Sequence, residues 1–193
     1  MKIYVTGLGV VSGIGLGVAE NIASLRKHQH GMGKVTLFPT ELDVPVSEVK
    51  YSNEELKRLL SLDIQKTFSR TALLGMLAAR EAVDDARLDL NTLRVGLISS
   101  TSIGGMDLSE HFYNAFKKDN RKGRLREVIS HDCGASTEMI ADYLKVNDFV
   151  TTISTACSSA ANAIMLGARM IRNGQLDAAI VGGTDALCKF TLN

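Results

Sequence analysis

The feature that most constrains the fold is the regular alternation of short β-branched apolar runs with longer helical patterns. The apolar runs predict strands over Lys2–Thr6, Arg94–Ser99, Val150–Ser154 and Ala178–Val181. The segments between them predict helices over Val18–Lys27, Asn53–Leu60, Ser69–Ala86, Met106–Lys118, Ser136–Leu144 and Ser158–Asn173. Strands separated by helices indicate a largely parallel sheet covered on both faces. The sequence therefore predicts an α/β fold.

The connections are read from their turn residues. Gly7–Gly17 is a glycine-rich turn, and residues 28–50, which hold both prolines, indicate loops. Ser52 or Asn53 is a candidate N-cap, and Gly174 stands where a glycine commonly ends a helix.

Composition bounds the function classes. A chain of 193 residues is long enough for one domain, and we expect residues 1–193 to form it. The hydrophobic fraction of 45% excludes a disordered chain, and a net charge of +1 gives no general attraction to nucleic acid. No apolar run approaches the roughly 20 residues of a membrane span, and the glycine-broken N-terminus is unlike a signal peptide.

The cysteines indicate a reduced environment. Cys133, Cys157 and Cys188 show neither a disulfide framework nor the CxxC spacing of a metal site. We therefore expect a cytoplasmic protein without a metal. No cofactor is expected either, because "GLGVVSGIGLG" has Ser12 where a dinucleotide-binding loop needs its third glycine.

The stretch "FVTTISTACSSAANAI", Phe149–Ile164, places one cysteine between a strand and a helix. Cys157 is followed by small residues, as in a sharp turn that lifts a nucleophile above the sheet. The helix that follows directs free N–H groups and its positive dipole end at the sulfur, which favours the reactive thiolate. The same N–H groups suit an oxyanion hole. The alternative interpretation is a buried structural cysteine.

Four segments together resemble the β-ketoacyl-[acyl-carrier-protein] synthases, the condensing enzymes of fatty acid and polyketide synthesis. They are "VTGLGVVSGIG", "TALLGMLAAREAVDDA", "RVGLISSTSIGGM" and "STACSSAANAIMLGARMIRNGQLDAAIVGGTDA". They occur in the family's order and span almost the whole chain. The TACSS context and the opening VTGLG are closer to the elongating type than to the initiating type.

The resemblance implies a thiolase-like fold of two related halves, each with a mixed five-stranded sheet and helices on both faces. Cys157 then matches the nucleophile that accepts an acyl chain from acyl carrier protein as a thioester. Its backbone N–H matches one oxyanion donor. Gly104 and Gly105 lie in the loop after the second expected strand, here called the Gly-Gly loop. Substrate-binding positions of the family are matched by Ile103 and Gly104 in this loop and by Ala156 and Ser158 beside the cysteine.

The chain departs from the family in what it lacks. Condensing enzymes use two histidines, a lysine and a second oxyanion donor from the second half of a chain about twice as long. The histidines here, His28, His30, His111 and His131, lie in no segment that resembles those motifs. We therefore expect the N-terminal half of a condensing enzyme, incomplete for condensation by itself. Its face toward a second half is expected to be exposed and apolar, and to promote association.

A second departure is "SHDCGAST", Ser130–Thr137, which is more polar than the apolar segment that closes the acyl tunnel in elongating synthases. His131 and Asp132 are therefore candidate substrate-binding residues for an unusual acyl chain, such as an aromatic or polyunsaturated one. A structural polar loop is the alternative.

The densest basic run is "KKDNRKGRLRE". It is either a solvated helix end or a docking surface for the acidic acyl carrier protein. The docking candidates are Lys117, Arg121, Lys122, Arg124 and Lys66, with Lys57 and Arg58 as possible neighbours.

Three functional classes follow. The first is a condensing enzyme that works as a homodimer, or as a heterodimer with a related synthase. The second is a non-catalytic partner, truncated or resembling a chain-length factor, although the nucleophilic cysteine argues against the latter. The third is a cysteine hydrolase, which requires a histidine within hydrogen-bond reach of Cys157.

Overall fold

The computed structural model describes residues 1–192 and places a small parallel sheet at the centre. Its strands are β5 (Val95–Ser100), β6 (Phe149–Ile153) and β7 (Ala178–Val181), in the order β6-β5-β7. β5 pairs in parallel with both neighbours, Gly96 facing Phe149 and Ala179. Every residue of β5 is buried, because β5 is the central strand and is covered on both faces.

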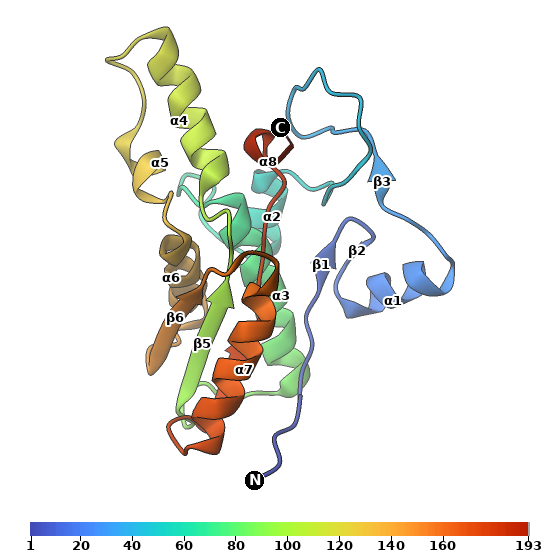
Figure 1. The fold of residues 1–193 in the computed structure, drawn as a ribbon, viewed down its shortest axis with the longest axis vertical. Helices are drawn as coiled ribbons and strands as arrows, with labels where there is room; N and C mark the ends of the chain where they lie inside the picture. Colours follow the sequence, from blue (N-terminus) through green and yellow to red (C-terminus); the bar gives the residue numbers. More distant parts are fainter. Residues whose placement is uncertain (193) are drawn as a thin grey trace.

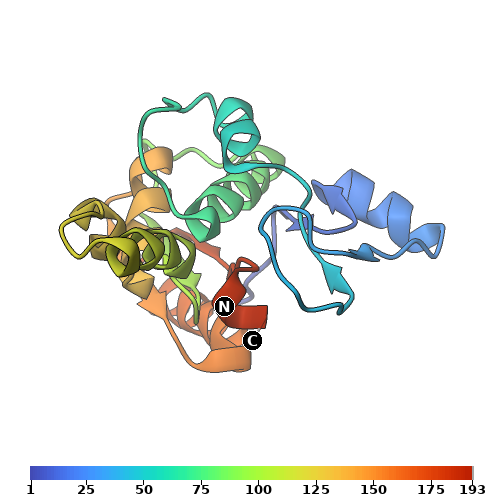
Figure 2. The same ribbon diagram turned by 90° about the horizontal axis from the view of Figure 1, so that it is seen from above.

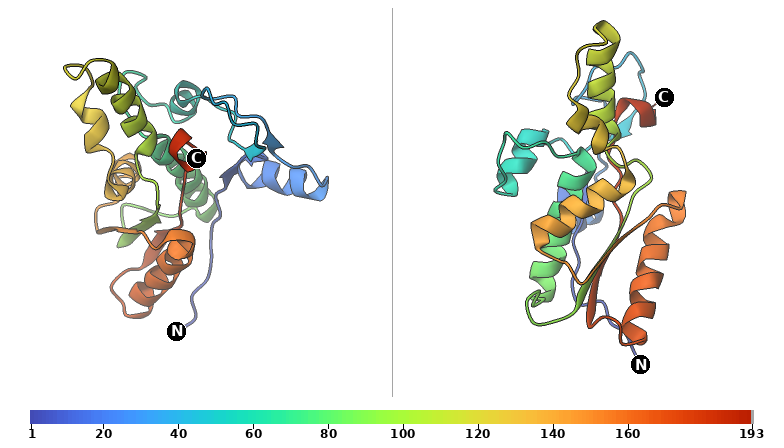
Figure 3. Two further views of the ribbon diagram at one scale, coloured as in Figure 1. Left: turned by 45° about the horizontal axis from the view of Figure 1, so that its top comes forward. Right: turned by 90° about the vertical axis from the view of Figure 1, so that its left-hand side faces the viewer.

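Helices cover both faces of this sheet (Figure 3). One face carries α7 (Ser159–Arg172), and the other carries α3 (Arg70–Ala86) and α6 (Cys133–Leu144). Two apolar clusters fill these interfaces. The larger one includes Leu73 and Met76 of α3, and the smaller one joins Ile98 to Ala163 of α7.

A helical arm projects beyond one end of the sheet (Figure 1). It consists of α4 (Met106–Lys118) and α5 (Leu125–Ile129), and the rings of Phe112 and Phe116 stack within it at 5.7 Å between centroids. The short helix α8 (Lys189–Leu192) contacts α4, where the Glu110 carboxylate accepts a 2.6 Å hydrogen bond from the Phe190 amide.

The N-terminal region lies to one side of the sheet (Figure 2). In chain order it contains β1 (Val11–Ser12), β2 (Gly15–Leu16), α1 (Val18–Arg26), β3 (Met32–Gly33) and β4 (Val46–Ser47). The helix that follows, α2 (Asn53–Leu59), packs on α3. β1 pairs with β2 and β3 with β4, each pair antiparallel and only two residues long. The loop expected over residues 28–50 therefore contains a small hairpin-like pairing that the sequence analysis missed.

The prediction of a strand over Lys2–Thr6 is wrong. Residues 1–10 form no regular element, and Tyr4 and Val5 are 73% and 80% exposed. The chain approaches α3 only after this segment: the Leu8 and Val10 amides donate to the carboxylates of Asp85 and Glu81. Gly9 permits this close approach, because a Cβ there would lie 1.9 Å from the Ala78 carbonyl oxygen.

The central sheet therefore has three parallel strands within residues 1–192, and not the five mixed strands expected. The missing strands have a physical explanation. The N-terminal segment is anchored on α3 at Leu8 and Val10 and pairs with no strand, and the outer edge of β7 has no partner strand in the described residues.

The other expected elements are confirmed within a few residues. Ser52 caps α2 in a capping box with Glu55, and Ser69 caps α3. α6 begins at Cys133, three residues earlier than expected, because Asp132 caps it by accepting a hydrogen bond from the Gly134 amide. α5 and α8, of five and four residues, were missed. No helix in the described part of the chain has the length and apolar character to cross a membrane.

Candidate active site

Cys157 lies in a strained turn between β6 and α7. It is exposed, and it sits in a single 3₁₀ turn, Ala156–Ser158, that leads into the helix. Ala156 has a φ of 53°, in the left-handed region that residues with a Cβ avoid. Such strain persists only where neighbouring contacts hold it, and it concentrates at functional sites.

Small polar side chains hold this turn. The Thr155 amide donates to Ser159 Oγ at 2.8 Å, and Ser159 Oγ donates to the Ala156 carbonyl at 2.7 Å. Ser158 Oγ donates to the Thr155 carbonyl at 2.8 Å, and Asn162 Nδ2 donates to Thr155 Oγ1 at 2.9 Å. Each bond ties the first turn of α7 to the end of the strand segment. The turn is therefore built to keep Cys157 fixed and accessible.

The sheet brings a second loop to the same edge. β5 and β6 are parallel and in register at their ends, Ser100 facing Ile153, and the Thr101 amide donates to the Ile153 carbonyl. The Gly-Gly loop that follows Ser100 therefore leaves the sheet beside the strand that leads to Cys157. Ligands of parallel sheets bind at this carboxyl edge.

Thr101 and Asp185 organise the Gly-Gly loop. Thr101 Oγ1 accepts hydrogen bonds from the amides of Ile103 and Gly104, and it donates to Asp185 Oδ1 at 2.6 Å. Asp185 also accepts from the Ser102 amide at 2.9 Å. Neither residue was predicted from the sequence. The available signal was that each is a polar residue shortly after a strand of a parallel sheet.

The Gly-Gly loop packs against the "SHDCGAST" segment, so the structure brings together two sets of predicted substrate-binding residues. Gly104 is buried with a φ of 56°, and a Cβ on it would lie 2.6 Å from the His131 carbonyl oxygen. Ile103 is half-buried beside it. The polar side chains of the segment have structural partners, because Asp132 caps α6 and His131 Nδ1 lies 2.8 Å from Ser109 Oγ. Their binding of substrate stays a prediction.

The three thiols differ in exposure. Cys157 is exposed, Cys133 is half-buried and Cys188 is buried. Burial raises the pKa of the Cys188 thiol, which keeps it protonated and unreactive. Within residues 1–192 no hydrogen bond joins a histidine to Cys157: His131 pairs with Ser109, and His111 Nδ1 lies 3.0 Å from Glu127 Oε2. This arrangement does not favour a hydrolase.

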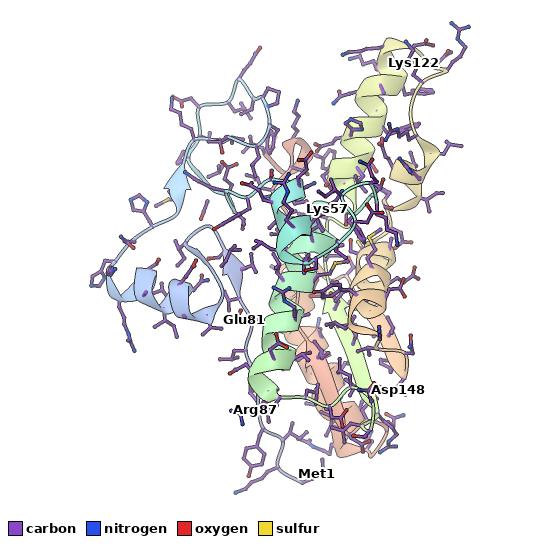
Figure 4. All side chains as sticks on the ribbon, turned by 180° about the vertical axis from the view of Figure 1, so that it is seen from behind. Met1, Lys57, Glu81, Arg87, Lys122 and Asp148 are labelled. Carbon is purple, nitrogen blue, oxygen red and sulfur yellow. The ribbon has the colours of Figure 1, made fainter. Side chains whose placement is uncertain are left out.

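The predicted docking residues fall in two places. Lys117, Arg121, Lys122 and Arg124 are exposed around the tip of the helical arm, where Asp119 pairs with Arg121 and Lys122. Figure 4 shows Lys122 at that tip and Lys57, a residue of α2, away from it. Lys66 lies at the Lys57 end, since Lys57 Nζ donates to the carbonyls of Ile64 and Lys66. The Lys57 ammonium group is therefore already bound by backbone carbonyls of its own chain.

Comparisons with known proteins identify the family of the chain. The profile of the family described as "Beta-ketoacyl synthase, N-terminal domain" matches residues 1–191. The chain is 29% identical to 3-oxoacyl-[acyl-carrier-protein] synthase 2 of Staphylococcus aureus (strain MRSA252), over 96% of this chain and 46% of that protein. It is 28% identical to Nodulation protein E of Rhizobium meliloti (strain 1021), over 96% of this chain and 47% of that protein.

Solved structures show the same fold. The ishigamide ketosynthase/chain length factor superposes with a TM-score of 0.85 and 28% identity, over 97% of this chain and 48% of that chain. The chain thus spans about half the length of the relatives it matches. Its thiolase-like fold follows from these likenesses. By the match over residues 1–191, the chain belongs to the β-ketoacyl synthase family, in the part that forms the N-terminal domain.

Proposed function

We propose that this chain is the nucleophile-bearing part of an elongating β-ketoacyl-[acyl-carrier-protein] synthase. The observation that carries the proposal is the exposed Cys157 in its strained turn, held by Ser158, Ser159 and Asn162 at the carboxyl edge of the sheet. Family membership supports the reaction class.

In the first step, the Cys157 thiolate attacks the thioester carbonyl of an acyl carrier protein. A new C–S bond forms at the cysteine, the bond to the carrier's sulfur breaks, and the carrier leaves as its thiolate. This step is covalent catalysis by an activated thiol. The Cys157 amide, at the start of the helical segment, is the proposed donor to the developing oxyanion. Ile103 and Gly104, with Ala156 and Ser158, are the proposed contacts of the acyl chain.

In the second step, malonyl carrier protein loses carbon dioxide, and the electron pair left behind attacks the acyl carbonyl. The bond to Cys157 Sγ breaks, and the 3-oxoacyl product stays on the carrier. The family resemblance assigns the histidines of this step to a second half. In residues 1–192, His111 and His131 have other partners, so we propose acylation but not condensation for this part alone.

The tip of the helical arm is the proposed docking surface for the acidic carrier. Asp119 pairs with two of the six basic side chains that are exposed there, which are Lys117, Lys118, Arg121, Lys122, Arg124 and Arg126. Such a surface speeds the encounter with an acidic partner in a salt-dependent manner. Replacing both Lys122 and Arg124 by Glu should lower the association rate about tenfold at low salt. Lys34→Glu is the control, because Lys34 lies in the N-terminal region and pairs with Asp43.

The decisive experiment is intact mass spectrometry after incubation with acyl-loaded carrier protein. The wild-type chain should gain the mass of the acyl group, and Cys157→Ala should not. Cys133→Ala is the matched control and should still gain it. An acyl mass that persists in Cys157→Ala would overturn the proposal.

The second candidate is a non-catalytic, carrier-binding partner of a related synthase. The reason to consider this candidate is that a solved relative is described as a ketosynthase/chain length factor. Carrier binding without any acyl mass on the wild-type chain would favour it. Either candidate acts in a homodimer or a heterodimer, and apolar side chains such as Ile129 and Ile164, 77% and 54% exposed, are available for such contacts.

A further inference from the structure

The buried polar atoms without a hydrogen-bond partner belong to residues that are connected with Arg70. In the part of the chain described they are Glu48 Oε2, Thr71 Oγ1 and Asp107 Oδ1. All three belong to the surroundings of Arg70. Thr71 follows Arg70, Asp107 accepts a 2.9 Å hydrogen bond from the Arg70 amide, and the neighbour of Glu48, Val49, accepts one from the Arg70 guanidinium. Buried polar atoms are normally paired, so this region lacks a partner.

A small, partly open cavity has one of these side chains, Glu48, in its lining. Its volume is about 60 Å³, and its polar lining includes Glu48, Arg70 and Asp185. Its apolar wall includes Leu37, Phe38 and Leu74. The lining therefore comes from the N-terminal region, from α3 and from the segment after β7. A cavity of this size holds one ion together with a water molecule or two.

Glu48 is the side chain that requires a partner. It is 2% exposed, and its Oε1 accepts hydrogen bonds from both the amide and the hydroxyl of Thr36, at 2.8 and 2.5 Å. Two donors on one oxygen suit an ionised carboxylate. Its Oε2 accepts none. A buried carboxylate oxygen without a partner is costly, so a donor or a cation is needed beside it.

Arg70 does not supply that partner. Its guanidinium donates to three neutral oxygens: the carbonyls of Val49 and Tyr51 and the side chain of Asn53. No ion pair joins Arg70 to Glu48 among the described residues. The positive charge of Arg70 is near, but its N–H groups point to the segment that follows Glu48.

The charge of the lining selects the ligand. Two carboxylates, Glu48 and Asp185, and one guanidinium leave one negative charge around the cavity. A monovalent cation neutralises this charge, whereas a divalent cation such as Ca²⁺ would leave one positive charge uncompensated in a partly buried site. The geometry points to a binding site for one monovalent alkali cation, K⁺ or Na⁺, held by Glu48 and Asp185. The cation would join the N-terminal region to the segment that orders the Gly-Gly loop.

The test is the thermal unfolding of the 193-residue chain in KCl, NaCl and choline chloride at equal ionic strength. Choline is too large for the cavity and serves as the reference cation. The melting temperature should be about 3 °C higher in KCl or NaCl, because only the folded chain holds the ion. Glu48→Gln should abolish this difference. Glu138→Gln, at an exposed glutamate of α6, should keep it.

Equal melting temperatures in the three salts would overturn the proposal and leave a water-filled cavity. A cation effect that survives in Glu48→Gln would overturn it as well. If Glu48→Gln does not fold, crystals of the wild-type chain grown in RbCl give an independent test. An anomalous peak beside Glu48 Oε2 is expected, and its absence would contradict the site. Neither readout depends on acyl transfer.

Discussion

The two long helices on opposite faces of the sheet, α3 and α7, are buried to very different degrees. In α3 every residue from Arg70 to Leu77 is buried. In α7 only Ser159, Ala163, Gly167 and Met170 are buried, and they form one stripe at helical spacing. α3 packs against α2, α6 and β7, whereas α7 packs on the sheet alone (Figure 3).

Because of this difference, we expect α3 to contribute mainly to stability and α7 mainly to the placement of Cys157. The first half of α3 is buried around its whole circumference, so it carries much of the core. α7 contacts the sheet along one line, and its outer side exposes Ile164 and Met165 at 54% and 44%. The start of α7 is therefore free to present Cys157. Four substitutions, from the largest expected effect to the smallest, test this division.

Core truncation should distinguish the two helices most strongly. Leu73→Ala removes a side chain of α3 with no exposed surface and should lower the free energy of unfolding by about 3 kcal/mol. Ile164→Ala on the outer side of α7 should change it by less than about 0.5 kcal/mol. Urea denaturation followed by circular dichroism measures both. A large loss for Ile164→Ala would mean that the outer side of α7 is covered in solution, for example by another copy.

The contact of α7 with the sheet depends on Gly167. A Cβ there would lie 2.6 Å from Val181 Cγ1 and 3.3 Å from the Cβ of Ala179. Gly167→Ala should therefore move the helix off β7 and cost about 2 kcal/mol, more than the gain in helix propensity.

Gly134→Ala in α6 is the matched control for that substitution. The nearest atom to its new Cβ would be Asp132 Oδ1, at an ordinary 3.4 Å. We expect a neutral or slightly stabilising effect in the same denaturation experiment. Equal effects of the two substitutions would show that α7 tolerates displacement, which contradicts tight packing on the sheet.

Relief of the backbone strain at Ala156 should raise the free energy of unfolding, whereas Leu73→Ala and Gly167→Ala should lower it. Ala156→Gly removes the Cβ that disfavours the φ of 53°, so the free energy of unfolding should rise by about 1 kcal/mol. Ala161→Gly, at an exposed position inside α7, should lower it by a similar amount. Acylation of Cys157, followed by mass spectrometry, should be slower in Ala156→Gly. Destabilisation by Ala156→Gly would show that the turn is relaxed.

The smallest expected effect on stability concerns the end of the sheet opposite Cys157, where Arg94 and Asp177 precede β5 and β7. Arg94 donates two hydrogen bonds from its guanidinium to the Asp177 carboxylate, which lowers the pKa of Asp177 from 3.8 to about 2. Because the folded-state pKa is the lower one, this pair stabilises the fold above about pH 4 and is lost as the pH falls toward 2. Both side chains are partly exposed, at 55% and 39%, so the contribution is small.

Asp177→Asn should therefore be less stable than the wild type at pH 7, and the two should converge near pH 2. Denaturation at several pH values measures the difference. Asp142→Asn, at an exposed position of α6, is the control and should run parallel to the wild type. A difference for Asp177→Asn that stays constant down to pH 2 would rule out the ion pair as its cause.

Local sequence signals predicted most helices and three of the four expected strands. Met106–Lys118 and Ala178–Val181 have the bounds that the sequence indicated. These elements follow from apolar periodicity and from caps such as Ser52 and Ser69, which act over a few residues. The position of Cys157 between a strand and a helix followed from the same local signals.

The Lys2–Thr6 segment shows the limit of such signals. Its β-branched pattern predicts a strand, but a strand needs a partner, and the nearest one is decided by residues far along the chain. Here Asp85 and Glu81 of α3 accept the amides of Leu8 and Val10, just after the segment, and residues 2–6 pair with no strand. Short elements such as α5 and β3 also depend on tertiary contacts, because so few residues give no periodicity.

By itself, the sequence determined the α/β order of elements, the family and the cysteine at the seam between strand and helix. Only the tertiary structure decided the number of paired strands, the joining of the Gly-Gly loop to the Ser130–Cys133 segment, and the cavity beside Glu48. The reason is the distance along the sequence over which each interaction acts. Caps and periodicity act over one or two turns, whereas strand pairing, close approach of backbones and the burial of an unpaired carboxylate arise from residues tens of positions apart.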